Sequence, residues 1–290
     1  MSELNLLFDY QGELPECPTW DEKQQSLYWT DILAKQIHRF RLADKQHHVW
    51  SFDEEVGCFA LNQSGGFIVA MRSAIWLTDS EGKLTDKICD NPSNPALARF
   101  NDGGTDATGR FYAGTFWGPQ DFDGALLCRV DQNKHVKVLQ CGIKGHNGLA
   151  FSPDGRFMIT SDTPNGKLYR TPINENGEPG ERQLWRQFFS ETGVPDGGAF
   201  DTEGCYWSAL YNGYKVIRIS PEGEILTEIP LPVRCPTMVC FGGPQMKTLF
   251  ITTTRENMQQ DELQLRPLSG SIFTIETDVI GMHKPTYRDA

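Results

Sequence analysis

The chain has 290 residues with a formal net charge of −11 at pH 7, and 39% of its residues are hydrophobic, including 17 Phe, 8 Tyr and 7 Trp. This composition can fill a sizeable core, and the acidic excess repels phosphate backbones, so we expect a globular protein with no nucleic-acid partner. No apolar run is as long as a membrane span, and the first residues lack a basic start followed by an apolar stretch. We therefore expect no membrane partner and a cytoplasmic location.

A short segment that is typical of a β-strand recurs six times along the chain. The six copies begin 40, 44, 46, 48 and 44 residues apart and lie at residues 27–29, 67–69, 111–113, 157–159, 205–207 and 249–251. Each copy is rich in aromatic or β-branched residues, and four of them follow a turn that contains glycine. These features together predict strands.

A second strand is predicted soon after several copies, because apolar and polar residues alternate there with a period of two. The clearest examples are residues 36–40, 167–170 and 215–219. A unit of several strands that repeats every 40 residues or so is typical of propeller blades, and a propeller closes on itself, whereas a solenoid has open ends. We therefore predict an all-β fold in which residues 1–290 form one domain, a six-bladed β-propeller with four antiparallel strands per blade.

The sixth unit ends soon after the strand-like residues 271–275 and is one strand short. The N-terminal residues 4–8, with the sequence LNLLF, can supply the missing strand. We therefore expect the N-terminal strand to close the ring, so that both ends of the chain contribute to one blade.

One residue per unit is expected at the central channel, where the innermost strand of each blade begins. Counting back eight residues from the turn glycines marks these positions in four units, and a coarser alignment of aromatic residues marks the other two. The positions are Glu16, Gly57, Asn101, Asn147, Asp196 and Thr237. Most of them are polar, and the symmetry of the blades brings them together although they are far apart in the sequence.

A Glu, two Asn and an Asp that converge in a channel form an oxygen-rich set, which suits a hard divalent cation such as calcium, magnesium or manganese. Histidine and thiolate are nearly absent from this set, so zinc is a less natural choice, although zinc with carboxylate ligands stays open. The alternative is that Asp and Asn occupy tight turns and bond to nearby backbone. The equivalent placement in successive units favours the metal site, as do neighbouring Pro and Gly residues that let the backbone turn.

Several motifs occur in a characteristic order along the chain. They are residues 16–20 (ECPTW) with 27–32 (LYWTDI), 99–103 (RFNDG), 147–152 (NGLAFS), 195–197 (PDG) and 241–243 (FGG). Each motif alone is weak, but the ordered set, which spans nearly the whole chain, resembles the senescence marker protein, regucalcin and gluconolactonase family. The resemblance implies a six-bladed propeller that hydrolyses lactones of sugar acids with one divalent metal in its channel.

The resemblance also implies roles for individual residues. The metal ligands of the family correspond to Glu16, Asn147 and Asp196, and its substrate-binding Arg and Asn correspond to Arg99 and Asn101. Asp196 is further implied as the catalytic residue that takes a proton from the attacking water. The chain is thus expected to be a metal-dependent lactonase, a carboxylic-ester hydrolase that converts an aldonolactone into the free aldonic acid. Its cofactor would be one Ca, Mg, Mn or Zn ion, and its partner a small-molecule sugar lactone.

Two segments depart from the family or match it poorly. Residues 15–18 read Pro-Glu-Cys-Pro where the family usually has Gly-Glu-Gly-Pro, so the carboxylate is kept but the glycines on either side of it are lost. Residues 117–123 offer acidic candidates for a lid over the pocket but no secure match. Phe116, Trp117 and Tyr214 could form the pocket wall, because sugar rings pack on aromatic side chains, or they could pack between blades.

Two other functions stay open. The same scaffold and metal could serve an esterase or phosphotriesterase, and a propeller could bind calcium without catalysis. A protein without catalytic activity has no need of carboxylates and amides that converge in the channel, which favours the lactonase. The sugar acid, the native metal and the oligomeric state are not predicted.

Overall fold

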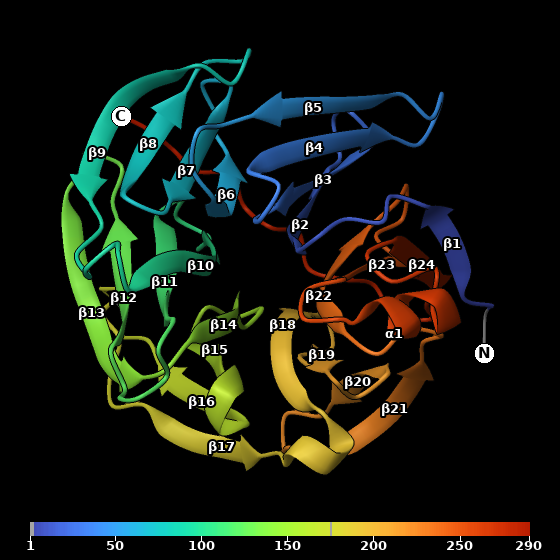
Figure 1. Ribbon diagram of the computed structural model, residues 1–290. Helices are drawn as coiled ribbons and strands as arrows, with labels where there is room; N and C mark the ends of the chain where they lie inside the picture. The colour runs from blue at the N-terminus through green and yellow to red at the C-terminus, as the bar shows by residue number, and fades with distance from the viewer. Residues whose placement is uncertain (1–2, 175) are drawn as a thin grey trace.

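The computed structural model describes residues 3–174 and 176–290, which form six four-stranded antiparallel sheets arranged in a ring (Figure 1). The predicted six-bladed propeller with four antiparallel strands per blade is therefore confirmed. The assignment of residues 1–290 to one domain stays a prediction.

The first five blades each use four strands that are consecutive in the chain, counted outward from the axis. Blade 1 has β2 (Pro15–Asp21), β3 (Ser26–Asp31), β4 (Gln36–Arg41) and β5 (His47–Ser51). Blade 2 has β6 (Val56–Leu61), β7 (Phe67–Met71), β8 (Ala74–Thr78) and β9 (Leu84–Asp90). Blade 3 has β10 (Ala98–Thr105), β11 (Phe111–Trp117), β12 (Ala125–Val130) and β13 (Val136–Ile143).

Blades 4 and 5 repeat this arrangement, and blade 6 takes one strand from the other end of the chain. Blade 4 has β14 (His146–Phe151), β15 (Phe157–Asp162), β16 (Lys167–Pro172) and β17 (Gln183–Gln187). Blade 5 has β18 (Val194–Phe200), β19 (Tyr206–Tyr211), β20 (Lys215–Ile219) and β21 (Ile225–Pro230). Blade 6 has β22 (Pro236–Gly242), β23 (Thr248–Thr253), β24 (Ile272–Glu276) and β1 (Asn5–Phe8). Three short helices lie in loops: η1 (Thr163–Asn165), η2 (Ser190–Thr192) and α1 (Gln260–Leu265).

The six predicted strand segments all belong to the second strand of a blade, although Cys205 lies just before β19. These strands were the easiest to predict because both of their faces are covered by neighbouring blades. All residues of β3 and of β7 are buried, for example. A run that is buried on both faces consists of consecutive apolar residues, which is a stronger signal than alternation in an outer strand.

The N-terminal strand closes the ring as predicted. Strand β1 pairs antiparallel with β24, with Asn5 opposite Thr274 and Leu6 opposite Phe273. Figure 1 shows this blue strand at the outer edge of the red sixth blade. Just beyond β1, the Tyr10 hydroxyl donates to Oδ2 of Asp31 at 3.1 Å, which ties the N-terminal segment to blade 1 as well.

Apolar cores lie between neighbouring blades and hold the ring together. One cluster joins blades 1, 2 and 3 and includes the fully buried Phe59 and Phe111. Another joins blades 5, 6 and 1 and includes the fully buried Trp29 and Phe250. Burial of each large apolar side chain contributes about 2 kcal/mol, so the contacts between blades are a main source of stability.

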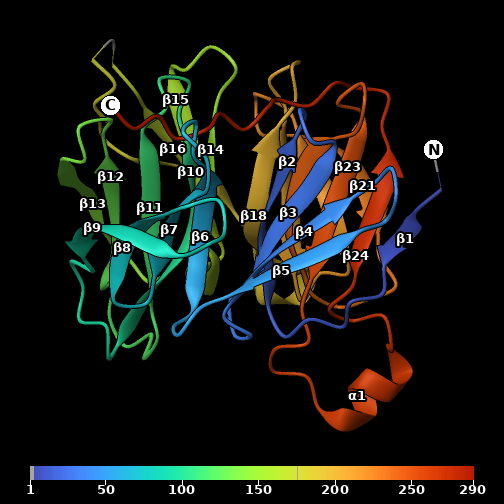
Figure 2. The same ribbon diagram turned by 90° about the horizontal axis from the view of Figure 1, so that it is seen from above.

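The two ends of the propeller have different structures because the strands are antiparallel. The innermost strand of each blade begins at the end where the second strand finishes, and the glycine turns between them lie at the opposite end. The C-terminal segment crosses the end with the glycine turns, where Gly281 bridges to Asp201 and Tyr287 bridges to Asn62. Figure 2 shows this red segment at the end opposite to α1. None of the helices within the described ranges is long and apolar enough to span a membrane.

Candidate active site

A β-bulge occurs beside the axial residue of every innermost strand. The register against the second strand shifts between Glu16 and Thr19, Val56 and Cys58, Phe100 and Gly103, Asn147 and Ala150, Pro195 and Gly198, and Pro236 and Met238. A bulge inserts an extra residue and redirects the side chains around it, and bulges are common next to active sites. The predicted axial positions therefore coincide with the local irregularity that can turn a side chain toward the channel.

Two residues within these bulges have a left-handed backbone. Gly148 has φ +62°, and a Cβ atom there would lie 2.5 Å from the Tyr206 hydroxyl and 2.7 Å from the backbone oxygen of Asp196. Cys17, at the position of the second glycine in the family's Gly-Glu-Gly-Pro, also has a left-handed backbone, with φ +51°. A non-glycine residue in this conformation costs about 1–2 kcal/mol.

The five predicted site residues line one cavity of about 890 Å³. They are Glu16 from β2, Arg99 and Asn101 from β10, Asn147 from β14 and Asp196 from β18. The volume is in the usual range for a small-molecule site. The other two axial positions do not contribute: a Cβ on Gly57 would collide with the backbone of Phe100, and Thr237 donates to the backbone oxygen of Pro15 at 2.6 Å.

A chain of hydrogen bonds joins the predicted substrate-binding and metal-binding residues. Nη1 of Arg99 donates to Oδ1 of Asn101, and Nδ2 of Asn101 donates to Oδ1 of Asn147. Nδ2 of Asn147 in turn donates to the Thr163 hydroxyl at 2.7 Å, and that hydroxyl donates to the backbone oxygen of Pro195 at 2.8 Å. Blades 3, 4 and 5 are thus connected through polar groups at the cavity floor.

Glu16 and Asp196 are buried carboxylates that lack a basic partner. They are only 6% and 5% exposed, and no described Lys, Arg or His forms an ion pair with either of them. Burial raises the pKa of Glu16, and the charge of Asp102 raises it further. Burial also raises the pKa of Asp196, followed by repulsion from Glu16 and Asp102. The pair therefore requires either protons or a cation to be stable.

The donor set fits a hard divalent cation. Two carboxylates and the amide oxygen of Asn147 are all oxygen ligands, which calcium, magnesium and manganese prefer, and a double positive charge would offset the two carboxylates. Across residues 3–174 and 176–290 there is no cluster of three or more His, Cys, Asp or Glu side chains that could hold a metal. The axial set differs from such clusters because an Asn amide takes the third place.

Asp102 supports the site from behind and was not singled out by the sequence. It is 3% exposed, and its carboxylate accepts hydrogen bonds from the backbone amides of Gly103 at 2.6 Å and Leu149 at 3.0 Å. These bonds tie the bulge of β10 to the bulge of β14. They also place a further negative charge near Glu16 and Asp196, which increases the need for a cation.

The predicted wall and lid are present only in part. Phe116, Gly118, Pro119 and Gln120 line the cavity, but Trp117 and Tyr214 do not. The Trp117 ring instead packs on Phe122, with the centroids 4.4 Å apart, and its Nε1 donates to Asp121 at 2.7 Å. The acidic candidate Asp121 is therefore engaged in holding the loop, and Gln120 is the polar lid residue at the cavity.

Several lining residues were missed because only the start of the innermost strand was examined. The loops that follow the second strands lie at the same end of the propeller. They contribute Arg72 after β7, Tyr211 and Asn212 at the end of β19, and Glu256 and Asn257 after β23. The repeat contained the signal, because these residues lie at or just beyond the end of a second strand. Burial raises the pKa of Glu256, and the nearby charge of Arg99 opposes that shift.

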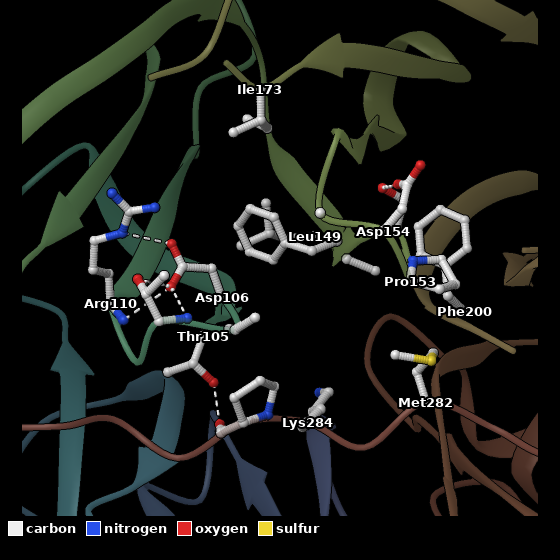
Figure 3. A pocket seen from close by; sticks show the side chains of 18 of the residues that line it. Thr105, Asp106, Arg110, Leu149, Pro153, Asp154, Ile173, Phe200, Met282 and Lys284 are labelled. Carbon is white, nitrogen blue, oxygen red and sulfur yellow. Dashed lines mark hydrogen bonds and ion pairs between the residues drawn. The ribbon is translucent and has the colours of Figure 1, made fainter. Parts of the chain in front are cut away.

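A second cavity, of about 380 Å³, lies at the other end of the propeller beneath the C-terminal segment (Figure 3). It shares no lining residue with the first cavity. Its walls are largely apolar, with Leu149, Phe200 and Met282, and its polar Asp106 already forms an ion pair with Arg110 at 2.6 Å. The convergent, unpaired carboxylates are found in the first cavity, which is therefore the candidate active site.

Fold and site together define the class of protein: a six-bladed β-propeller with an oxygen-rich axial pocket. Residues 14–255 match the family model described as SMP-30/Gluconolactonase/LRE-like region, and the chain belongs to this family. The resemblance inferred from the sequence motifs is thus confirmed.

Individual relatives match the chain over almost its full length. A 6-deoxy-6-sulfogluconolactonase of Pseudomonas putida is 48% identical over 275 residues, which is 94% of each chain. The regucalcin of Xenopus laevis is 31% identical over 276 residues and is matched over 90% of its length, which corresponds to 91% of this chain. A solved structure of a calcium-binding protein, regucalcin, from Agrobacterium tumefaciens has a TM-score of 0.93 at 26% identity, covering 99% of this chain and 98% of that one.

Proposed function

We propose that this sugar-lactone lactonase binds one divalent cation through Glu16, Asn147 and Asp196 and uses Asp196 as the base and Arg99 and Asn101 to bind the lactone. Hydrolysis of a cyclic ester makes the protein a carboxylic-ester hydrolase, and the product is the free aldonic acid. The single observation that carries the proposal is the pair of buried carboxylates, Glu16 and Asp196, without a basic partner in a cavity large enough for a sugar lactone.

The reaction adds one water across the ester bond. The bound cation supplies Lewis acidity toward the lactone carbonyl and the attacking water. The Asp196 carboxylate accepts a proton as the water oxygen bonds to the carbonyl carbon. The bond from that carbon to the ring oxygen then breaks, and the ring oxygen takes the proton from Asp196 to become a hydroxyl, which returns Asp196 to its carboxylate form. An Asp that ligates a cation is a weak base, so the cation would also have to acidify the attacking water.

Arg99 and Asn101 are suited to orient the lactone. Arg99 uses Nη1 for the backbone oxygen of Phe100, at 3.1 Å, and for the Asn101 side chain. Nε and Nη2 of Arg99 form no hydrogen bond with the residues that the structure describes, and they could donate to the carbonyl or hydroxyl oxygens of a sugar lactone. Asn101 is held by both Arg99 and Asn147, so its position relative to the cation site is fixed before substrate binds.

A six-carbon aldonolactone is the proposed substrate class. The 48% identical relative acts on 6-deoxy-6-sulfogluconolactone, and such similarity over 94% of the chain favours a lactone of the gluconic type here. Calcium is the favoured cation, because the site offers oxygen ligands and a structure of the same fold is a calcium-binding regucalcin. The cytoplasmic location and the absence of nucleic-acid and membrane partners stay predictions.

The test is hydrolysis of gluconolactone, galactonolactone, xylonolactone, arabinonolactone and 6-deoxy-6-sulfogluconolactone, followed with a pH indicator. An aryl ester and a phosphotriester serve as comparison substrates. We expect turnover of at least one six-carbon lactone, its loss after chelation, and its recovery when calcium, magnesium, manganese or zinc is added separately. Turnover of only the phosphotriester or aryl ester would favour the alternative hydrolase, and cation binding without any turnover would favour a non-catalytic propeller.

A further inference from the structure

We propose that Arg72 determines specificity by binding an anionic group on the terminal carbon of the lactone substrate. The inference rests on the proposed function, since it concerns the same cavity. Sulfonate, phosphate and carboxylate groups share the relevant chemistry, which is a set of negatively charged oxygens that accept hydrogen bonds from a guanidinium.

Arg72 lies on the cavity wall, and its place in blade 2 is nearer the rim than the axial positions. It follows β7, and its backbone amide donates to the backbone oxygen of Glu55 at 2.9 Å. Arg72 is therefore at the same height along the propeller axis as Glu55. Glu55 comes two residues before the axial position Gly57, just outside the innermost strand, and so lies toward the rim of the cavity. In an aldonolactone the terminal carbon is at the opposite end of the carbon chain from the carbonyl. A lactone with its carbonyl at Asp196 would point that carbon toward the rim.

The guanidinium of Arg72 is held in place before any ligand binds. Its Nε and Nη2 donate to the Glu55 carboxylate at 2.8 and 2.9 Å, and its Nη1 donates to the backbone oxygen of Pro95 at 2.9 Å. A guanidinium has five N–H donors, so two remain for a ligand. The Arg72 side chain is 35% exposed, which leaves it accessible from the cavity. A fixed donor loses little conformational entropy on binding.

A second guanidinium lies on the same side of the cavity. Arg99 of blade 3 also lines the cavity, and no ion pair within the described residues includes it. Burial lowers the pKa of Arg99, and the charges of Glu256 and Glu16 each oppose that shift more strongly than the charge of Arg72 adds to it. The carboxylates of Glu55 and Glu54 lie near Arg72. An anionic substituent would therefore be recognised through the N–H donors that remain free on the two guanidinium groups.

A carboxylate lines the cavity on the side of blade 6. Glu256 lies there, and the charge of Arg99 offsets part of the effect of its burial. A terminal anion would be repelled from Glu256, whereas the free N–H groups of Arg72 could donate to it. Glu256 and Arg72 together would therefore favour one orientation of the substrate.

The experiment compares kcat/KM for four six-carbon lactones that differ at the terminal carbon: a neutral hydroxymethyl, a sulfonate, a phosphate and a carboxylate. We expect the wild-type protein to prefer at least one anionic lactone over the neutral one, and the preferred group identifies the natural source of the charge. In Arg72→Met we expect kcat/KM for that lactone to fall about 10- to 100-fold, chiefly through KM, as for the loss of a charge-assisted hydrogen bond. Neutral gluconolactone should change by less than about threefold, since it makes no such bond.

Three further variants separate recognition from folding. Arg72→Lys keeps the charge and should retain part of the preference. In Arg72→Met alone, the Glu55 carboxylate loses its ion-pair partner. The double variant Arg72→Met with Glu55→Gln also removes that charge, so it should fold normally and still lose the preference for the anionic lactone. Arg129→Met breaks an ion pair with Glu178 outside the cavity and should leave all four rates unchanged. Melting temperatures show which variants are folded.

Equal losses for neutral and anionic lactones in Arg72→Met, or no preference in the wild-type protein, would overturn the role of Arg72. Absence of hydrolysis of any lactone by the wild-type protein would instead contradict the proposed function. In that case calorimetric binding of 6-deoxy-6-sulfogluconate and gluconate to the wild-type protein and to Arg72→Met still tests the anion site. Tighter binding of the sulfonate that depends on Arg72 supports it, and equal binding rejects it.

Discussion

The side-chain amide of Asn101 donates a hydrogen bond to Oδ1 of Asn147, so residues from two neighbouring blades meet at the floor of the candidate active site. The same Nδ2 donates to the backbone oxygen of His146 at 3.0 Å, while Oδ1 of Asn101 accepts from Arg99. Asn101 therefore connects the proposed substrate-binding residues to the proposed cation site. We therefore expect Asn101 to influence both the binding of the substrate and the affinity for the cation.

Replacement of Asn101 tests this connection. In Asn101→Ala, Asn147 loses the donor that orients its oxygen, and Arg99 loses an acceptor. We expect cation affinity to fall about 10-fold or more, because removal of a residue that orients a metal ligand usually has an effect of this size. We expect kcat/KM for gluconolactone to fall as well. Calorimetric calcium titration and initial rates measure the two effects. A variant that loses turnover but binds the cation with unchanged affinity would show that Asn101 acts on the substrate alone.

The bulge at Gly148 can be tested with a matched pair of glycine replacements. Gly148 and Gly155 have similar backbone angles, φ +62° and +69°, but a Cβ would collide with Tyr206 and Asp196 at the first and would meet open space at the second. Both replacements by Ala incur the left-handed penalty of about 1 kcal/mol, and only Gly148→Ala adds the collision. Urea unfolding should therefore show a distinctly larger destabilisation for Gly148→Ala. An equal decrease in the free energy of unfolding in Gly148→Ala and Gly155→Ala would mean that the bulge at Gly148 accommodates the Cβ atom without cost.

Ring closure by β1 predicts a loss of stability when the first ten residues are removed. The truncation exposes the edge of β24, removes the pairing of Asn5 with Thr274, and deletes the Tyr10 hydroxyl that bonds to Asp31. We expect the midpoint of thermal unfolding to fall by more than about 5 °C, which corresponds to a few kcal/mol in a chain of this size. Tyr10→Phe, which keeps the strand, should cause a smaller drop. A truncated protein that melts like the full-length chain would rule out this closure.

His38 makes stability depend on pH in the acidic range. It is buried against Tyr10 and His47, with Asp31 beyond Tyr10, and burial lowers its pKa to about 3. The unfolded chain binds a proton at His38 near pH 6.5, whereas the folded chain does not until pH 3. The contribution of His38 to the free energy of unfolding is therefore fully present above pH 6.5. It is lost as the pH falls toward 3, by up to about 1.4 kcal/mol per pH unit.

The matched variant is His38→Gln, which keeps a polar side chain that does not titrate. Urea unfolding at pH 7, 6 and 5 should show a shallower loss of stability in the variant than in the wild-type protein. The slope should not vanish, because His146 is also buried with its pKa lowered to about 3. Identical slopes would show that His38 is protonated at the same pH in both states.

The sequence predicted the ring because the second strands carry runs of apolar residues. It predicted four of the axial positions because each lies eight residues before a turn glycine, and the other two by alignment of aromatic residues. Asn101, Asn147 and Asp196 were located by this spacing, and Glu16 by alignment. It did not reveal that Gly57 and Thr237 do not line the cavity, since that depends on the close approach of Phe100 to Gly57 and on the hydrogen bond of Thr237 to Pro15.

Arg72 and Glu256 were not predicted for a different reason. They lie in loops after the second strands, where the repeat fixes the end of the propeller but not the direction of a long side chain. Arg72 faces the cavity because Glu55 and Pro95 hold its guanidinium there. Contacts of this kind join residues that are distant in the sequence and leave no local pattern.

The most direct test of the account is the initial rate of gluconolactone hydrolysis by Asp196→Asn with excess cation present. The amide can still offer an oxygen to the cation but cannot take a proton from water, so we predict a rate about 100- to 10,000-fold below that of the wild-type protein. Asp154→Asn, at the opposite end of the propeller, should retain the wild-type rate. Full activity in Asp196→Asn would contradict the proposal that the axial cavity carries out the hydrolysis with Asp196 as its base.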